Sequence, residues 1–199
     1  STAFDVSTSS FVDSFDISSQ EVSPTGLAFN NDGTKMFIAG NGGDDINEYT
    51  LSTGFDVSTA SFVDSFDVSS QDTAPNGLTF NSDGTKMYVV GNQGNDINEY
   101  DLTLGFDVST ASFVDSFDIS SQEGGPRALA FSADGTKMFV VGVLGDDVNE
   151  YTLSTAFDVS TSSFVDSFDI SSQEVSPTGL AFNNDGTKMF IAGNGGDDI

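Results

Sequence analysis

The sequence contains no cysteine, no histidine and no tryptophan, and only 5 lysines and arginines stand against 31 aspartates and glutamates. Without thiols or imidazoles the chain can form no disulfide, no Cys- or His-ligated metal site and no catalytic triad built on either residue. The formal charge of −26 argues against nucleic acid and anionic membrane surfaces as partners. No run of 18 apolar residues occurs, so we expect no membrane insertion. The apolar content of 37% is nevertheless that of a folded chain.

A repeat of 51 residues accounts for the whole chain and predicts one repeat array. Its units are residues 1–51, 52–102, 103–153 and 154–199, the last of them incomplete. The first two units match at 36 of 51 positions, and the fourth matches the first at all of its 46 positions. Because the chain begins at Ser1 rather than at a methionine, we expect a processed chain or a segment of something longer.

Each unit contains four short segments that are typical of β-strands. In the first unit these are residues 11–17, 26–29, 35–39 and 46–51, and a tight turn at 31–33 separates the middle two. No segment shows helical periodicity, and serine, threonine, aspartate, asparagine and glycine are too frequent for stable helices. The chain is therefore predicted to be all-β.

Residues 26–40 and 45–51 resemble the core of YVTN-type and related WD-like propeller blades, and residues 77–91, 128–142 and 179–193 repeat the first of these motifs. The chain departs from true WD repeats because it lacks their Trp-Asp and Gly-His pairs. The resemblance implies a β-propeller with four-stranded antiparallel blades, about four in this chain. Such a chain is half of an eight-bladed ring or a segment of a longer array. A β-solenoid is the alternative fold.

The two ends of the chain are complementary in this interpretation. Residues 11–17 form an outer strand that lacks the rest of its blade, and residues 179–199 form a blade that lacks its outer strand. The first can complete the second within one chain, between two chains or along a longer polypeptide. We therefore expect the chain to partner itself or neighbouring repeats.

The acidic residues suggest two roles. Calcium is the one cofactor that carboxylates without histidine or cysteine would suit, and solvation of an acidic surface is the alternative. The candidate calcium ligands flank the glycine-rich loops and are Asp44, Asp45, Asp96, Asp146, Asp147, Asp197 and Asp198. A second set shares a strand face with phenylalanines and is predicted to act as buried structural acceptors bonded to a neighbouring loop: Asp13, Asp64, Asp115 and Asp166.

The units differ most in two short loops, which propeller topology places on one face of the disc. Variable loops on a rigid scaffold often recognise ligands. The candidate binding residues at these loops are Glu21, Thr25, Asn41, Asp72, Asn76, Gln93, Arg127, Val143 and Leu144.

These observations predict a non-catalytic structural or adhesive module on a cell or virion surface, assembling through its complementary ends. The alternatives are a protein- or glycan-binding propeller that uses the variable-loop face, and an engineered fragment that closes into a ring. We expect no enzyme and no catalytic residue, because the carboxylates recur in every unit whereas an active site is normally unique. Propellers that hydrolyse lactones or oxidise sugars are expected to need histidine, a metal or a cofactor.

Overall fold

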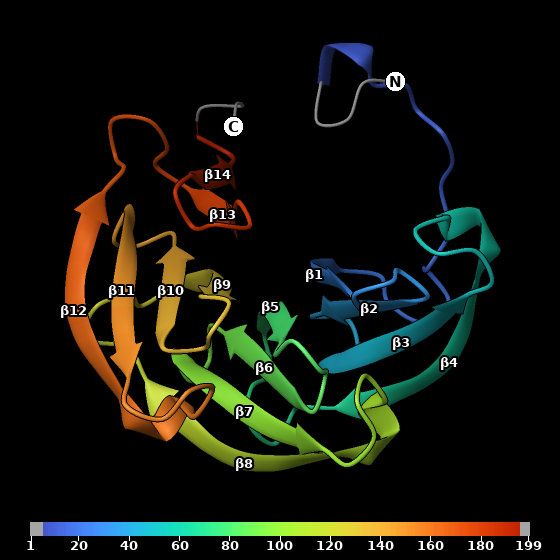
Figure 1. Ribbon diagram of the computed structural model, residues 1–199, viewed down its shortest axis with the longest axis horizontal. Helices are drawn as coiled ribbons and strands as arrows, with labels where there is room; N and C mark the ends of the chain where they lie inside the picture. Colours follow the sequence, from blue (N-terminus) through green and yellow to red (C-terminus); the bar gives the residue numbers. More distant parts are fainter. Residues whose placement is uncertain (1–5, 196–199) are drawn as a thin grey trace.

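The chain folds into antiparallel sheets that surround a common axis (Figure 1). The computed structural model describes residues 6–195. Three sheets have four strands each, in the order β1-β2-β3-β4, β5-β6-β7-β8 and β9-β10-β11-β12, and β13 and β14 form a further pair. Their bounds are β1 Pro24–Phe29, β2 Lys35–Gly40, β3 Asp45–Leu51, β4 Ala60–Asp67, β5 Pro75–Phe80, β6 Lys86–Gly91, β7 Asp96–Leu102, β8 Ala111–Asp118, β9 Pro126–Phe131, β10 Lys137–Gly142, β11 Asp147–Leu153, β12 Ser162–Asp169, β13 Pro177–Phe182 and β14 Met189–Gly193.

This arrangement is that of a β-propeller, as the repeat predicts, and not that of a solenoid. The first strand of each sheet lies next to the axis and the fourth lies at the rim (Figure 1). Short 3-10 turns precede the three rim strands and residues 9–17: η1 Val6–Thr8, η2 Val57–Thr59, η3 Val108–Thr110 and η4 Val159–Thr161. The helices within the described residues are these short turns, and none of them is long enough to cross a bilayer.

The hydrophobic core lies between neighbouring blades rather than within one. Phe37 and Ala39 of β2 pack with Leu78 of β5 and Val89 of β6 in one buried cluster. A second cluster joins the β5–β8 blade to the β9–β12 blade in the same way. Because each sheet has two faces to cover, a blade is buried only when it has a neighbour on each side.

Local sequence explains the tight hairpin between the first two strands of a blade. Gly33 has a φ of 71°, a left-handed conformation that glycine adopts without a side-chain clash. The carboxylate of Asp32 accepts hydrogen bonds from the backbone N–H and the hydroxyl of Thr34, at 3.0 and 2.6 Å. These contacts turn the chain from β1 into β2.

A β-bulge in each rim strand corrects the prediction of a packed aspartate. Phe62 lies opposite Tyr49 while Asp64 lies opposite Glu48, so Val63 is an extra residue. Neighbouring residues on β3 face opposite sides, and Phe62 and Asp64 therefore do so too. The carboxylate of Asp64 is exposed and accepts a bond from the next backbone N–H, not from a neighbouring loop. The same exposed position and bond recur at Asp13, Asp115 and Asp166.

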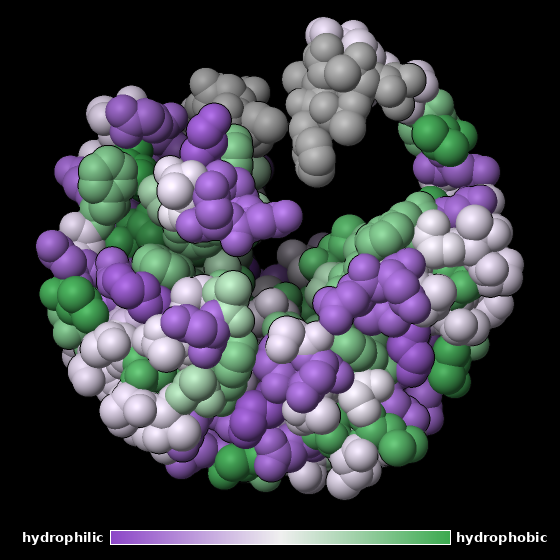
Figure 2. All heavy atoms as spheres, in the orientation of Figure 1, coloured by the Kyte–Doolittle hydropathy of each residue, from purple (hydrophilic) through white to green (hydrophobic). Residues whose placement is uncertain are grey.

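The ring is open between β13–β14 and β1 (Figure 1). Residues 11–17, predicted as a strand, run beside the first blade without strand pairing. Their counterparts in the next three units form β4, β8 and β12, each paired with the third strand of its own sheet. Figure 2 shows apolar surface bordering the opening over β1 and β2.

Candidate binding site at the channel mouth

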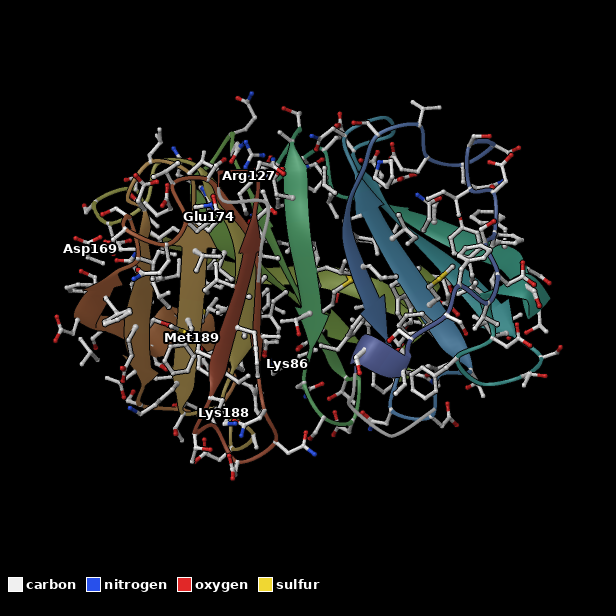
Figure 3. All side chains as sticks on the ribbon, turned by 90° about the horizontal axis from the view of Figure 1, so that it is seen from above. Lys86, Arg127, Asp169, Glu174, Lys188 and Met189 are labelled. Carbon is white, nitrogen blue, oxygen red and sulfur yellow. The ribbon has the colours of Figure 1, made fainter. Side chains whose placement is uncertain are left out.

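The first strands of the four sheets line a central channel, and one end of it forms the candidate site. A cavity of about 180 Å³ runs along β1, β5, β9 and β13. A second cavity, of about 330 Å³, opens at one end and is lined by residues that we call the channel mouth: Thr25, Asn76, Arg127, Val143, Ser176, Thr178 and Asn194. Figure 3 shows Arg127 at this end of the disc and Lys188 towards the opposite end.

Equivalent positions in the four repeats supply the centre of the mouth. Thr25, Asn76, Arg127 and Thr178 are each the second residue of a first strand. The Thr25 hydroxyl donates to the carbonyl of Pro75 at 2.7 Å, and Asn76 Nδ2 donates to that of Pro126 at 2.9 Å. The side chains of Thr25 and Asn76 therefore each reach across to the next blade and hold the first strands together.

Arg127 brings a positive charge to the mouth. Its Nη1 donates to Oδ1 of the buried Asn76 at 2.9 Å, which fixes the orientation of the guanidinium. No ion pair between the described residues involves Arg127, whereas Lys35, Lys86 and Lys137 each pair with a glutamate of their own blade. A guanidinium has five N–H donors, so most of them remain available to a ligand.

Buried carboxylates support the loops around the mouth. Glu21 accepts from the N–H groups of Ser23 and Gly42, and Asp72 accepts from those of Ala74 and Gln93. Glu123 and Glu174 occupy the same position in the next two units and accept loop N–H groups in the same way. Because Glu21 and Asp72 are buried beneath the loops, the site is built without these two predicted residues.

The other predicted binding residues divide into two groups. Thr25, Asn76, Arg127 and Val143 come together at the mouth. Asn41, Gln93 and Leu144 stand exposed on the surrounding loops and line neither cavity. Three further mouth residues were not predicted from the sequence: Ser176, Thr178 and Asn194. They are the fourth-unit copies of Ser23, Thr25 and Asn41, so the repeat itself could have identified them.

Three of the candidate calcium residues bond to a neighbouring asparagine, whereas the Oδ1 of Asp146 is buried without a hydrogen-bond partner among the described residues. Asp44 and Asp146 have positive φ values at the loop tips, while Asp45, Asp96 and Asp147 each accept from the amide of the asparagine two residues on. Burial raises the pKa of Asp45 and of Asp96. Asp197 and Asp198 lie outside the described residues. Within residues 6–195 no three carboxylates come close enough to hold a metal ion. Calcium stays a prediction, which melting with and without a chelator would test.

Solved structures share this fold at low sequence identity. A protein from Bacteroides uniformis named as a candidate 6-phosphogluconolactonase is 14% identical, with a TM-score of 0.63, over 85% of this chain and 47% of that one. The periplasmic gluconolactonase PpgL of Pseudomonas aeruginosa is 18% identical, with a TM-score of 0.57 and the same coverage. The Swd1 β-propeller domain of Myceliophteria thermophila is 13% identical, with a TM-score of 0.56, over 85% and 50%. The chain thus spans about half the length of each.

These likenesses identify the fold as a β-propeller. The sequence matches no family model and no curated protein. Two of these three structures carry the names of lactonases, and this contradicts the predictions of a non-catalytic structural or adhesive module and of a chain that is not an enzyme. Those predictions relied on carboxylates that recur in every unit, whereas Arg127 at the mouth occurs in one unit alone.

Proposed function

We propose that the chain binds a sugar lactone at the channel mouth and hydrolyses it to the open acid. The observation that carries the proposal is Arg127, which presents a guanidinium without a carboxylate partner among the described residues to a polar cavity on the propeller axis. The fold shared with proteins named as gluconolactonases supports it. We include in the proposal the assignment of the blades to the YVTN type, from residues 26–40 and 45–51.

The mouth has the chemistry to recognise a polyhydroxylated ester. Thr25, Ser176 and Thr178 offer hydroxyl groups and Asn194 offers an amide, all of which can bond to sugar hydroxyls. The amide of the buried Asn76 is already bonded to Pro126 and Arg127. The guanidinium of Arg127 suits the ester carbonyl oxygen or an acidic substituent of the sugar. The cavity volume of about 330 Å³ lies at the lower end of the range for small-molecule sites.

Arg127 would act on the transition state of ring opening. Water attacks the carbonyl carbon, and negative charge develops on the carbonyl oxygen of the tetrahedral intermediate. The bond from that carbon to the ring oxygen then breaks, and the ring oxygen takes up a proton as the attacking water loses one. A guanidinium held in place by Asn76 can stabilise the developing charge without reorganising. The mouth residues include no carboxylate or imidazole, so the proton of the attacking water passes to solvent.

Hydrolysis of glucono-δ-lactone, followed by acid release in a weakly buffered indicator solution, tests the proposal. We expect the chain to exceed the buffer rate and Arg127→Ala to lose about 100-fold or more of that excess, as removal of an oxyanion donor does. Arg127→Lys should keep part of it, because the charge remains. The matched control is Lys188→Ala, which removes an exposed cation towards the opposite end of the disc. A wild-type rate equal to buffer, or full activity in Arg127→Ala, would overturn the proposal.

A further inference from the structure

Neighbouring blades meet through one aromatic contact that the chain makes three times. An aromatic ring from the second strand of a blade packs against a phenylalanine from the first strand of the next. The ring centroids lie 4.6 Å apart for Phe37 and Phe80, 4.5 Å for Tyr88 and Phe131, and 4.6 Å for Phe139 and Phe182. A loop phenylalanine packs beside the first-strand ring, as Phe106 does on Phe80 at 5.3 Å.

Both ends of the open ring expose one half of this contact. At one end Phe190 of β14, the counterpart of the fully buried Phe37, is 50% exposed. At the other end Leu27 of β1 is 59% exposed, although its counterpart Leu78 is only 7% exposed. Phe55, the counterpart of Phe106, is 63% exposed. These side chains are of the kind that the chain buries wherever two blades meet.

Residues 9–17, which we call the N-terminal segment, already lie where the rim strand of a preceding blade would be. Phe15 contacts Tyr49 with ring centroids 5.7 Å apart. Phe66 of β4 contacts Tyr100 of the next blade at 5.5 Å in the same edge-on geometry. The segment has no strand partner, and Phe11 and Val12 are more than 80% exposed. It therefore marks one side of a slot that lacks the inner strands of a blade.

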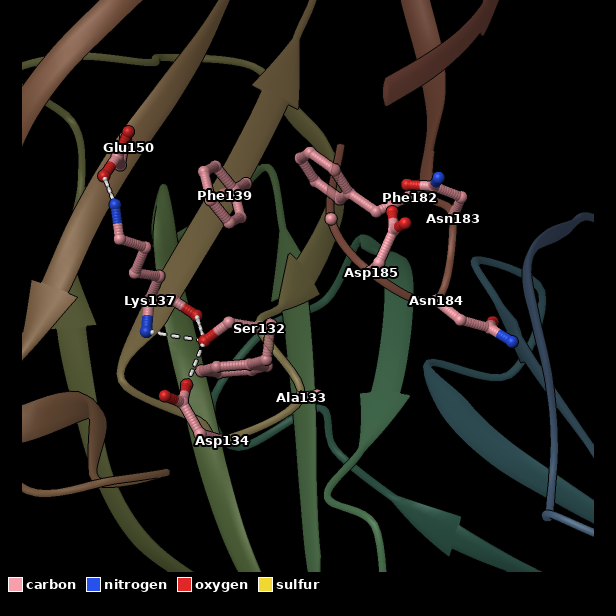
Figure 4. Close-up of a pocket in the computed structure, with 12 residues that line it drawn as sticks. Ser132, Ala133, Asp134, Lys137, Phe139, Glu150, Phe182, Asn183, Asn184 and Asp185 are labelled. Carbon is pink, nitrogen blue, oxygen red and sulfur yellow. Dashed lines mark hydrogen bonds and ion pairs between the residues drawn. The ribbon is translucent and has the colours of Figure 1, made fainter. Parts of the chain in front are cut away.

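Beside the C-terminal hairpin, a cavity occupies the place that a loop fills in each complete blade. About 630 Å³ is open between β10 and the β13–β14 hairpin, beside Phe139, Phe182 and Glu150 (Figure 4). In the preceding blades Phe106 and Phe157 pack on the hairpin glycines Gly84 and Gly135, whereas no residue among 6–195 packs on Gly186 in this way. The fourth unit of the sequence ends before this phenylalanine, and its counterpart in the first unit is Phe4.

We propose that a second copy of the chain docks head to tail on the first. The β13–β14 hairpin of one copy enters between the N-terminal segment and β1 of the other, and Phe190 packs on Phe29 and Phe55 of that copy. Residues 154–199 are identical to residues 1–46, so nearly every contact of this interface has a counterpart that the chain already makes. The occupant is therefore a blade of this same repeat.

The combined length of two copies suits a closed ring. The chain spans 47 to 50% of the solved propellers described above, so two copies have about the length of one such propeller. Closure covers both apolar end faces. The contact is heterologous, because the two surfaces that meet are different. Repeating such a contact gives a closed ring when the rotation between successive copies leads back to the first copy.

Sedimentation of the 199-residue chain tests the proposal. We expect a species of twice the 20.8 kDa chain mass. Phe190→Asp and Leu27→Asp should each give monomers, because a charge then lies in the apolar contact. The matched control, Leu104→Asp, changes an equally exposed leucine in a loop away from both ends and should leave the dimer intact.

Mixing the two variants distinguishes head-to-tail docking from a symmetric contact. A mixture of Phe190→Asp and Leu27→Asp retains one intact pair of surfaces and should form dimers that neither variant forms alone. A circular dichroism melt of each variant confirms that it is folded. A monomeric wild-type chain, a dimer that survives Phe190→Asp, a mixture that stays monomeric or a ladder of larger species would each overturn the proposal.

Discussion

Buried glutamates connect one blade to the next at the scale of single residues. Glu48 accepts from Lys35 Nζ at 2.6 Å and, through its other oxygen, from the backbone N–H of Val108 at 2.9 Å. Glu99 makes the equivalent bonds to Lys86 and to the N–H of Val159. Both carboxylates are buried and fully partnered, which makes their burial tolerable. Glu150 pairs with Lys137 at 2.5 Å but remains partly exposed, with a side-chain exposure of 28%.

Glu150, the counterpart of Glu99 in the next unit, provides a control for how much the bond between blades stabilises the fold. Glu99→Ala should lower the free energy of unfolding by about 2–3 kcal/mol, because a buried backbone donor and part of a lysine lose a charged partner. Glu150→Ala should cost less than about 1 kcal/mol, because its ion pair faces solvent. Both glutamate variants also carry Phe190→Asp, so that the chain is monomeric, and urea unfolding measures their free energies of unfolding. Equal losses in the two variants would show that the bond to the next blade adds nothing.

The central residues of the mouth could be predicted from sequence, whereas the support beneath it could not. Thr25, Asn76 and Arg127 stand out because they differ between otherwise similar units. Glu21 and Asp72 differ in the same comparison, yet they lie below the loops and bind backbone N–H groups. A change from glutamate to aspartate looks the same in sequence for a ligand contact and for a buried acceptor. Only the positions of Gly42 and Gln93 distinguish the two roles.

At the scale of elements, the hairpin turns are held by ionised aspartates. The Ser132 hydroxyl, followed by the backbone and hydroxyl of Thr136, lowers the pKa of Asp134 to about 2. The Thr34 hydroxyl, then its N–H, lowers the pKa of Asp32. The pKa values of Asp83 and Asp185 are lowered in the same way by the threonines of their own turns. Each turn thus binds the carboxylate more strongly than the carboxylic acid.

These turns predict a loss of stability in acid. A folded-state pKa below the unfolded value of 3.8 means that the unfolded chain takes up protons first, so stability is full above that value and falls towards pH 2. Asp45 and Asp96, whose pKa values are raised by burial, act in the opposite direction but are fewer. We expect the melting temperature to fall between pH 4 and pH 2, and Asp134→Asn to lie below wild type at pH 6 and to converge with it near pH 2. A constant difference across this range would contradict the role of the ionised carboxylate.

The positions of the strands could be predicted from alternation and turn residues, but the sides on which the rim-strand side chains lie could not. The expected strands at 26–29, 35–39 and 46–51 correspond to β1, β2 and β3 within two residues at each end. In the rim strand, strict alternation placed Asp64 beside Phe62, and the bulge at Val63 placed them on opposite sides. A bulge depends on pairing with another strand, here Glu48 and Tyr49 of β3. No pattern within the rim strand itself reveals it.

At the scale of the whole molecule, charge opposes the contacts that geometry favours. Each chain carries a formal charge of −26, so two copies repel each other as they approach. The end faces that would meet carry Leu27, Phe55 and Phe190, so the attraction between them is apolar and short-ranged. Salt screens the charge repulsion between copies and leaves the apolar attraction between the end faces largely unchanged.

Head-to-tail docking should therefore strengthen with salt. The Debye length falls from about 30 Å at 0.01 M to about 10 Å at 0.1 M, so most of the repulsion between copies disappears over this range. We expect sedimentation equilibrium to show a dimer dissociation constant that decreases as sodium chloride rises from 0.01 to 0.2 M, while Phe190→Asp stays monomeric throughout. A dissociation constant that increases with salt would mean that ion pairs hold the copies together. Because the exposed end faces are apolar and the chain is uniformly acidic, that result would require an interface other than the blade contact.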